Sequence, residues 1–290
     1  MRLRELAAAA LVAMLALTAM VVTPALTRVQ IRFKPEIATR AVRLASNEAS
    51  VALHLAGSGP ATPASPQPSP PPPAVDPLAG EVADATDRLQ HRIPADLYPY
   101  FDVYLYVSKA AAGSLAQHMF VFHREGDRGL AFEQAFPVST GRERHERYFT
   151  STPEGLFQLD PNRFERVHYS HTWHGAAMPW AMFLDAVIRG RQTGVALHSA
   201  DSHVAELGTR ASGGCVRLPP DKAADLFDRF STQEHGLVPI FAYDPANHRT
   251  NGDGLVLRDG HGNPVLTPGY RVLLYIEDYP GGPALVAVIA

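Results

Sequence analysis

Cysteine is nearly absent from this sequence, which has one, Cys215, in 290 residues. A single thiol cannot form a disulfide within the chain, and this excludes a disulfide-stapled fold. Cys215 lies in RASGGCVRLPP, residues 210–220, with two glycines before it. It is therefore either an inert packing residue or a working nucleophile.

An excess of charge of one sign is also lacking. Lys and Arg number 26 against 29 Asp and Glu, which gives a formal net charge of −3. This balance offers no electrostatic case for a nucleic-acid partner. Hydrophobic residues make up 46% of the chain, as in ordinary globular proteins, so we expect one good-sized core. No pattern in the sequence predicts a cofactor.

One long apolar run stands at the N-terminus. Leu6 to Val22 carries no charge and follows Arg2 and Arg4. Residues 1–27 are therefore predicted to be a signal peptide or an N-terminal signal-anchor. Both stay open, because the run is near the lower limit of about 17 residues for a membrane-spanning helix. A buried N-terminal helix is the weaker alternative, since it would need burial all round.

Export follows from either interpretation of the N-terminus. We expect the protein in the periplasm or cell envelope, with a tether to the inner membrane if residues 1–27 are an anchor. An unpaired cysteine in an oxidising compartment requires an explanation.

Two segments separate this N-terminus from the folded part. Residues 28–58 are a membrane-proximal segment in which 37–55 has weak helical periodicity. Residues 59–80 are rich in proline, alanine and serine, and almost uncharged. Such a composition cannot bury a core and favours extended polyproline II, so this segment is predicted to be a semi-rigid linker. A recognition ligand for a partner domain is the alternative.

The folded domain is expected over residues 92–245. Short apolar and β-branched segments with Gly, Pro and Thr between them predict strands at 101–108, 117–124, 130–140, 155–160, 194–199 and 237–244. Residues 219–231 predict a helix, with Pro220 in its first turn. Residues 180–190 fit a helix or a strand. The fold class is therefore mainly β with one or two helices (α+β), in a sandwich or barrel-like core.

Residues 246–290 are assigned to a C-terminal extension. The segment is rich in turn residues and ends in two strand-like stretches. Either a hairpin packed on the core or a small appendage fits this pattern.

Three features between residues 194 and 221 carry chemistry. His198 and Ser199 end an apolar strand, Ser212 to Cys215 reads SGGC, and Arg217 follows. A nearby base or cation activates a thiol, and His198 could accept its proton. Glycines let a backbone approach closely and direct amides at an oxyanion. The candidates are His198 and Cys215 for catalysis, with Ser199, Ser212, Gly213 and Gly214 as oxyanion or support residues.

These residues resemble the signature of the L,D-transpeptidase catalytic domain of the YkuD type. In that family a histidine followed by Gly or Ser ends a strand, and a Ser-His-Gly-Cys-apolar-Arg/Asn run comes later. Four other segments resemble the family in the right order, namely FPVSTGR (136–142), TPEG (152–155), AMPWAMFL (177–184) and VALH (195–198). The resemblance covers roughly residues 98–245.

The resemblance implies an L,D-transpeptidase-like β-sandwich that acts on peptidoglycan stem peptides through a thioester on Cys215. It implies that His198 is the base, and that the protein helps to build cross-links in the cell wall. One position departs from the pattern: Gly213 stands where the family run usually has histidine. The supporting role of that histidine has no counterpart here, and His203 is the alternative second histidine.

Several alternatives stay open at this point. Water in place of an acceptor amine would make the protein an L,D-carboxypeptidase-type hydrolase, and Gly213 motivates a non-catalytic wall-binding module. Arg217 is either a structural ion-pair residue or a ligand for a substrate carboxylate. The i, i+3, i+6 spacing of His168, His171 and His174 is one that metal ligands can have. No metal site is predicted, because zinc usually requires a defined helix or strand face and often an acidic or cysteine ligand. The oligomeric state is not determined.

Overall fold

The structure is a computed structural model, and it describes residues 77–144 and 150–282. The predicted signal or anchor (1–27), the segment 28–58 and most of the linker lie outside the described residues. Within the described part, no helix is both long enough and apolar enough to cross a membrane.

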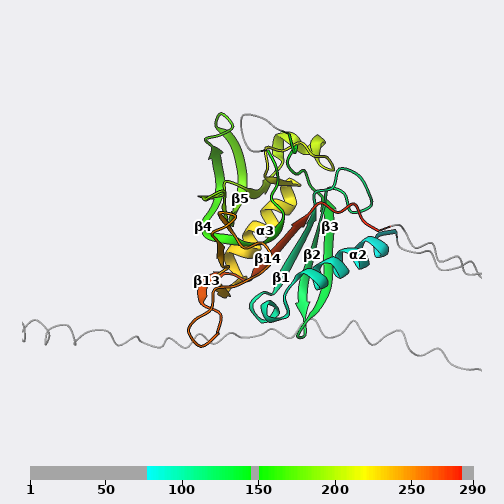
Figure 1. Cartoon of the computed structure of the whole chain (residues 1–290). Helices are drawn as coiled ribbons and strands as arrows, with labels where there is room; N and C mark the ends of the chain where they lie inside the picture. The colour runs from blue at the N-terminus through cyan, green and yellow to red at the C-terminus, as the bar shows by residue number, and fades with distance from the viewer. Residues whose placement is uncertain (1–76, 145–149, 283–290) are drawn as a thin grey trace, which may run out of the picture. The chain divides into compact units, whose positions relative to one another are not determined.

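One eight-stranded mixed sheet organises the described chain, in the order β3-β2-β1-β14-β4-β5-β8-β9 (Figure 1). Its strands are β1 (Val103–Ser108), β2 (His118–Glu125), β3 (Gly129–Pro137), β4 (Gly155–Ser170), β5 (Ala176–Asp185), β8 (Ala196–Ser199), β9 (Val216–Leu218) and β14 (Val272–Glu277). The β1–β14 and β8–β9 pairs are parallel, and the other pairs are antiparallel.

Within residues 77–144 and 150–282, the remaining elements are two α-helices, two 3₁₀ helices and three small sheets. The helices are α2 (Pro77–Arg92), η1 (Ala95–Tyr100), η2 (Asp201–Glu206) and α3 (Pro220–Thr232). The small sheets pair β6 (Val187–Ile188) with β7 (Arg191–Gln192), β10 (His235–Pro239) with β13 (Leu266–Tyr270), and β11 (Tyr243–Asp244) with β12 (Arg249–Thr250).

Both faces of the central strands are buried. On β1, Val103 and Leu105 belong to one hydrophobic cluster while Tyr104 and Tyr106 belong to the other, as the alternation of a strand requires. The first cluster includes Leu226, Phe227 and Phe230 of α3, and the second includes Ala85 and Leu89 of α2. The two helices therefore cover opposite faces of the sheet, and the predicted α+β, mainly β class is confirmed.

Helix α2 differs from the sequence-based boundaries, which ended the linker at residue 80 and began the domain at residue 92. Its apolar residues Val82, Ala85 and Leu89 recur at helical spacing, and Ala85 and Leu89 are completely or almost completely buried. The proline-rich composition just before this helix favoured an extended segment there. The folded unit therefore includes the helix before residue 92.

The C-terminal segment also differs from its description as an extension. Strand β14 lies inside the main sheet, parallel to β1 and antiparallel to β4. All six of its residues are buried. A continuous apolar run is typical of a strand that is covered on both faces, and the turn-rich segment before it only brings the chain back to the core. Residues 272–277 are thus part of the domain itself.

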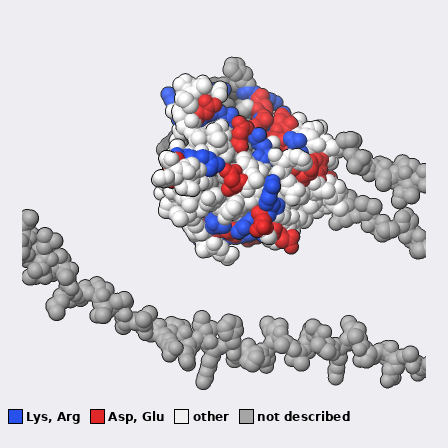
Figure 2. Space-filling model, turned by 60° about the horizontal axis from the view of Figure 1, so that its bottom comes forward, with Lys and Arg blue, Asp and Glu red and all other residues white. Residues whose placement is uncertain are grey.

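Charges of both signs are interspersed on the face of the domain shown in Figure 2. Charged side chains of the described residues also form ion pairs, for example Arg229 with Glu133 and Glu234. That face offers no broad surface of one sign for a polyanion.

Candidate active site

The parallel pairing of β8 and β9 brings the predicted catalytic residues together. Leu197 lies opposite Val216, and His198 lies opposite Arg217. Side chains alternate along a strand. The preceding residues Leu197 and Val216 point into the core, so His198 and Arg217 point to the opposite face. Cys215 immediately precedes β9 and lies on the His198 face, next to Ala196. Cys215 and His198 are 17 residues apart in sequence, and the pairing of β8 with β9 brings them to the same part of the sheet.

These side chains open onto one cavity of about 240 Å³. Its lining includes Cys215, His198, Arg217, Ser199, Ser212 and Gly213 among the residues that the sequence predicted, together with Trp173, Met178 and His203. Cys215 and His198 thus face one space that a substrate could enter.

His198 is held in a single tautomer. Its Nδ1 lies 2.8 Å from the carbonyl oxygen of Ser199, and since a carbonyl only accepts, Nδ1 carries the proton. Nε2 of the neutral ring is then an acceptor, which is the state that a general base requires. Burial lowers the pKa of His198 to about 4; the Ser199 hydrogen bond opposes this effect, and the positive charge of Arg217 adds to it. His198 is therefore neutral at pH 7.

Cys215 rests as a thiol. Its side chain is half-buried against a small apolar cluster that includes Met178 and Ala196, and Sγ lies 3.7 Å from the Gly194 carbonyl oxygen. Burial raises the pKa of Cys215, against smaller opposing effects of a backbone hydrogen bond with Ala196 and of the Arg217 charge. His198, which lines the same cavity, is neutral, so no nearby imidazolium stabilises a thiolate at rest.

The loop that carries Cys215 is fixed by Ser212. This hydroxyl is almost completely buried, accepts the Gly214 amide at 3.1 Å and donates to the Cys215 carbonyl. The Gly214 amide was predicted to face an oxyanion. In the structure it donates to Ser212 within the loop. Gly214 instead supplies conformation, because its φ of +116° is one that L side chains rarely adopt.

A second support comes from residues that the sequence did not single out as functional. Thr152 Oγ1 donates to the Gly214 carbonyl at 2.9 Å and accepts the Gly141 amide at 2.8 Å. Ser139 and Arg217 exchange backbone hydrogen bonds of 3.0 and 2.9 Å. The FPVSTGR and TPEG segments thus support the loop that carries Cys215. Their place in the family pattern was the only sequence signal for this role.

Ser199, Arg217 and His203 each have a local partner. Ser199 Oγ donates to the Asp201 carboxylate and so fixes the turn that follows β8. Arg217 Nη1 donates to Glu206, which is the ion pair that one interpretation of Arg217 predicted. His203 Nδ1 lies 3.0 Å from Ser202 Oγ, on the exposed 3₁₀ turn. Within residues 77–144 and 150–282, no group of three His, Cys, Asp or Glu side chains could hold a metal ion.

We predict that Ser212→Ala destabilises both the domain and its reactive loop. The change leaves a buried amide and a buried carbonyl without their partner, which costs about 1–3 kcal/mol of unfolding free energy. Denaturant unfolding measures this cost, and Ser231→Ala, at the accessible end of α3, is the matched control. Equal stability of the two variants would contradict the role given to Ser212.

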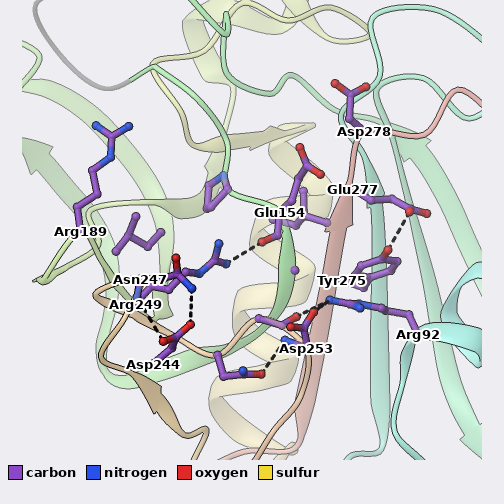
Figure 3. A pocket seen from close by; sticks show the side chains of 16 residues that line it. Arg92, Glu154, Arg189, Asp244, Asn247, Arg249, Asp253, Tyr275, Glu277 and Asp278 are labelled. Atoms are coloured by element: carbon purple, nitrogen blue, oxygen red, sulfur yellow. Dashed lines mark hydrogen bonds and ion pairs between the residues drawn. The ribbon is translucent and has the colours of Figure 1, made fainter.

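A larger hollow of about 710 Å³ lies elsewhere on the domain (Figure 3). Its charged side chains already have partners: Arg92 pairs with Asp253, and Arg249 donates to the Glu154 carbonyl at 3.1 Å. Neither Cys215 nor His198 lines it. The larger volume of this hollow therefore does not make it the candidate active site.

A thiol and an imidazole that face one cavity from adjacent parallel strands define the class of site, a cysteine–histidine pair. A family model for the L,D-transpeptidase catalytic domain (YkuD) matches residues 103–256, more than half of the chain, and this range contains the whole pair. The chain belongs to this family. No curated protein matches it.

Proposed function

We propose that this protein is an exported cysteine L,D-transpeptidase that cross-links peptidoglycan stem peptides. The family's substrate class supports peptidoglycan as the target. The observation that carries the proposal is the placement of Cys215 and His198 on one face of the β8–β9 pair, with Nδ1 of His198 engaged and Nε2 left as the acceptor. A thiol and a neutral imidazole that line one cavity support nucleophilic catalysis by the thiol.

The first half-reaction forms a thioester. His198 Nε2 takes the thiol proton as Sγ attacks the carbonyl carbon that precedes the terminal D-residue of a stem tetrapeptide. The carbonyl oxygen becomes an oxyanion, and the amides of Gly213 and Cys215 are the donors proposed to bind it, because the Gly214 amide is used by Ser212. As the tetrahedral intermediate collapses, the C–N bond breaks, His198 returns the proton to the leaving nitrogen, and the D-residue departs as an amine.

The second half-reaction releases the enzyme. An amine of a neighbouring stem attacks the thioester carbonyl, a new amide bond forms, and the thiol leaves with a proton regained through His198. Arg217 is proposed to attract a carboxylate of the stem peptide while Glu206 holds its guanidinium in place. No cofactor takes part in these steps.

Localisation in the periplasm or cell envelope is part of the proposal. The basic and apolar start of the chain supports export, and a tether to the inner membrane would place the domain beside the wall. An unpaired thiol at such a location is consistent with a catalytic role.

Product analysis tests the proposal. Purified protein is incubated with disaccharide-tetrapeptide monomers, and the products are separated and weighed by mass spectrometry. We expect cross-linked dimers together with one free D-amino acid for each bond formed. Shortened monomers alone would make water the acceptor and the protein an L,D-carboxypeptidase-type hydrolase. No change in the monomers would favour the non-catalytic wall-binding module.

A further inference from the structure

The two glycines before Cys215 are glycine for different reasons. Gly214 has the positive φ given above, whereas Gly213 is absent from the residues with positive φ. The backbone of Gly213 therefore accepts an L side chain. What excludes one is a neighbour: a Cβ at position 213 would lie 2.6 Å from Cε2 and 2.7 Å from Nε1 of Trp173.

The indole ring of Trp173 thus occupies the space that a side chain at position 213 would need. Trp173 comes from the turn between β4 and β5, 40 residues earlier in the chain. Both Trp173 and Gly213 line the cavity that holds Cys215 and His198. The aromatic ring and the nucleophile loop therefore meet at the wall of the reactive cavity.

Several contacts hold Trp173 in this position. Its amide donates to Ser170 Oγ at 3.2 Å, and its carbonyl accepts the Ala176 amide at 2.9 Å. The Arg142 guanidinium lies 5.3 Å from the ring centroid, within cation–π range. The Arg142 amide in turn donates to the Ser212 carbonyl at 3.1 Å, so the same residue touches the ring and the nucleophile loop. The turn contacts position the Trp173 backbone, and the Arg142 contact favours this orientation of the ring.

We infer that Trp173 is a specificity-determining residue of this enzyme, which forms the wall against which the donor stem peptide lies beside Cys215, and that Gly213 is glycine to make room for it. This rests on the proposed function, since it concerns the same cavity. A flat indole offers apolar area to the aliphatic part of a stem peptide and loses little conformational freedom on binding. The ring also replaces, from the turn between β4 and β5, the bulk that a side chain at position 213 would bring.

A double-mutant cycle tests the pairing of Trp173 with Gly213. The variants are Gly213→Ala, Trp173→Ala and the double variant, and Gly260→Ala is the control because a Cβ there meets no atom within 4 Å. The added methyl must push the ring or the loop by about 1 Å, so Gly213→Ala is expected to lower kcat/KM for the tetrapeptide donor by about 10²-fold. In the Trp173→Ala background the same change is expected to cost less than about threefold.

Substrate contact is tested by the split between KM and kcat. Trp173→Ala is expected to raise KM for the donor roughly tenfold with a smaller change in kcat, and Trp173→Phe to recover most of that loss because it keeps an aromatic face. Thermal unfolding of all the variants follows the packing independently: Gly213→Ala should lower Tm only while Trp173 is present.

The outcomes separate the two proposals. A wild-type protein that forms no acyl-enzyme contradicts the proposed function. An active wild type in which the Gly213→Ala loss is the same with and without Trp173 overturns the pairing. An unchanged KM in Trp173→Ala overturns the specificity role, even where the Tm cycle shows that the two residues pack together.

Discussion

Replacing Cys215 with alanine is expected to abolish covalent labelling of the protein by a carbapenem and to leave its stability nearly unchanged. A nucleophilic thiol attacks the strained β-lactam carbonyl and becomes acylated. The ring C–N bond breaks but nothing leaves, so the protein gains the full mass of the drug. The chain has no other thiol, and Cys215 is half-buried in a small cluster where a methyl group is tolerated. Intact-mass spectrometry measures the adduct, and thermal unfolding verifies the fold.

Cys215→Ser is the conservative companion of this variant. It keeps an oxygen nucleophile in place, but a hydroxyl is far less acidic and less nucleophilic than a thiol, so labelling is expected to fall by at least about 10³-fold. An adduct that forms on Cys215→Ala as fast as on the wild type would place the reactive group elsewhere and contradict the account.

Replacing His198 with glutamine is expected to lower the rate constant of acylation by about 10²–10⁴-fold, the contribution of a positioned general base. Glutamine has a similar size and can still donate to the Ser199 carbonyl, so the loop geometry is retained while the base is lost. Because burial lowers the pKa of His198 to about 4, the wild-type rate constant falls as the pH is lowered through about 4. Stopped-flow acylation at a series of pH values measures both effects.

The same pKa has a consequence for stability. A histidine in the unfolded chain titrates near its ordinary value of 6.5, so between pH 6.5 and about 4 the unfolded state binds the proton that the folded state does not. The free energy of unfolding therefore decreases as the pH falls through this window, by about 3 kcal/mol for this group. His198→Gln removes that contribution, and the difference between the two urea-unfolding profiles isolates it from the carboxylates.

A pH profile of acylation that is the same in His198→Gln and wild type would contradict the assignment of the base. His203, which lines the same cavity, would then be the next residue to replace.

Much of this site could be predicted from sequence because its residues are local. The strand before His198, the SGGC run and the helix after it are short-range patterns, and the single cysteine of the chain lies among them. The parallel pairing of β8 with β9 then only had to bring two strand ends together. Export and the roles of the individual side chains stay predictions.

The parts that could not be predicted depend on contacts between distant segments. No local pattern shows that Thr152 would reach the Gly214 carbonyl from 62 residues away. The occupation of the space at Gly213 by Trp173 is of the same kind. The place of strand β14 in the main sheet could not be predicted for a further reason. The turn residues before it suggested a C-terminal extension, whereas its pairing partners are β1 and β4.

The departure of Gly213 from the family pattern acquires a physical meaning in this structure. The missing side chain leaves no void, because the indole of Trp173 lies in its place. The absence of a second histidine at this position is therefore compatible with an ordered site around Cys215 and His198.

The most direct test of the account is the intact mass of the protein during its reaction with a stem tetrapeptide in the absence of an acceptor amine. Attack by Cys215 with loss of the terminal D-residue predicts a mass increase equal to the tetrapeptide minus that amino acid, reversed by hydroxylamine as a thioester requires and absent from Cys215→Ala. A folded wild-type protein that releases no D-amino acid and gains no mass would contradict the claim that Cys215 and His198 form an acyl-transfer site.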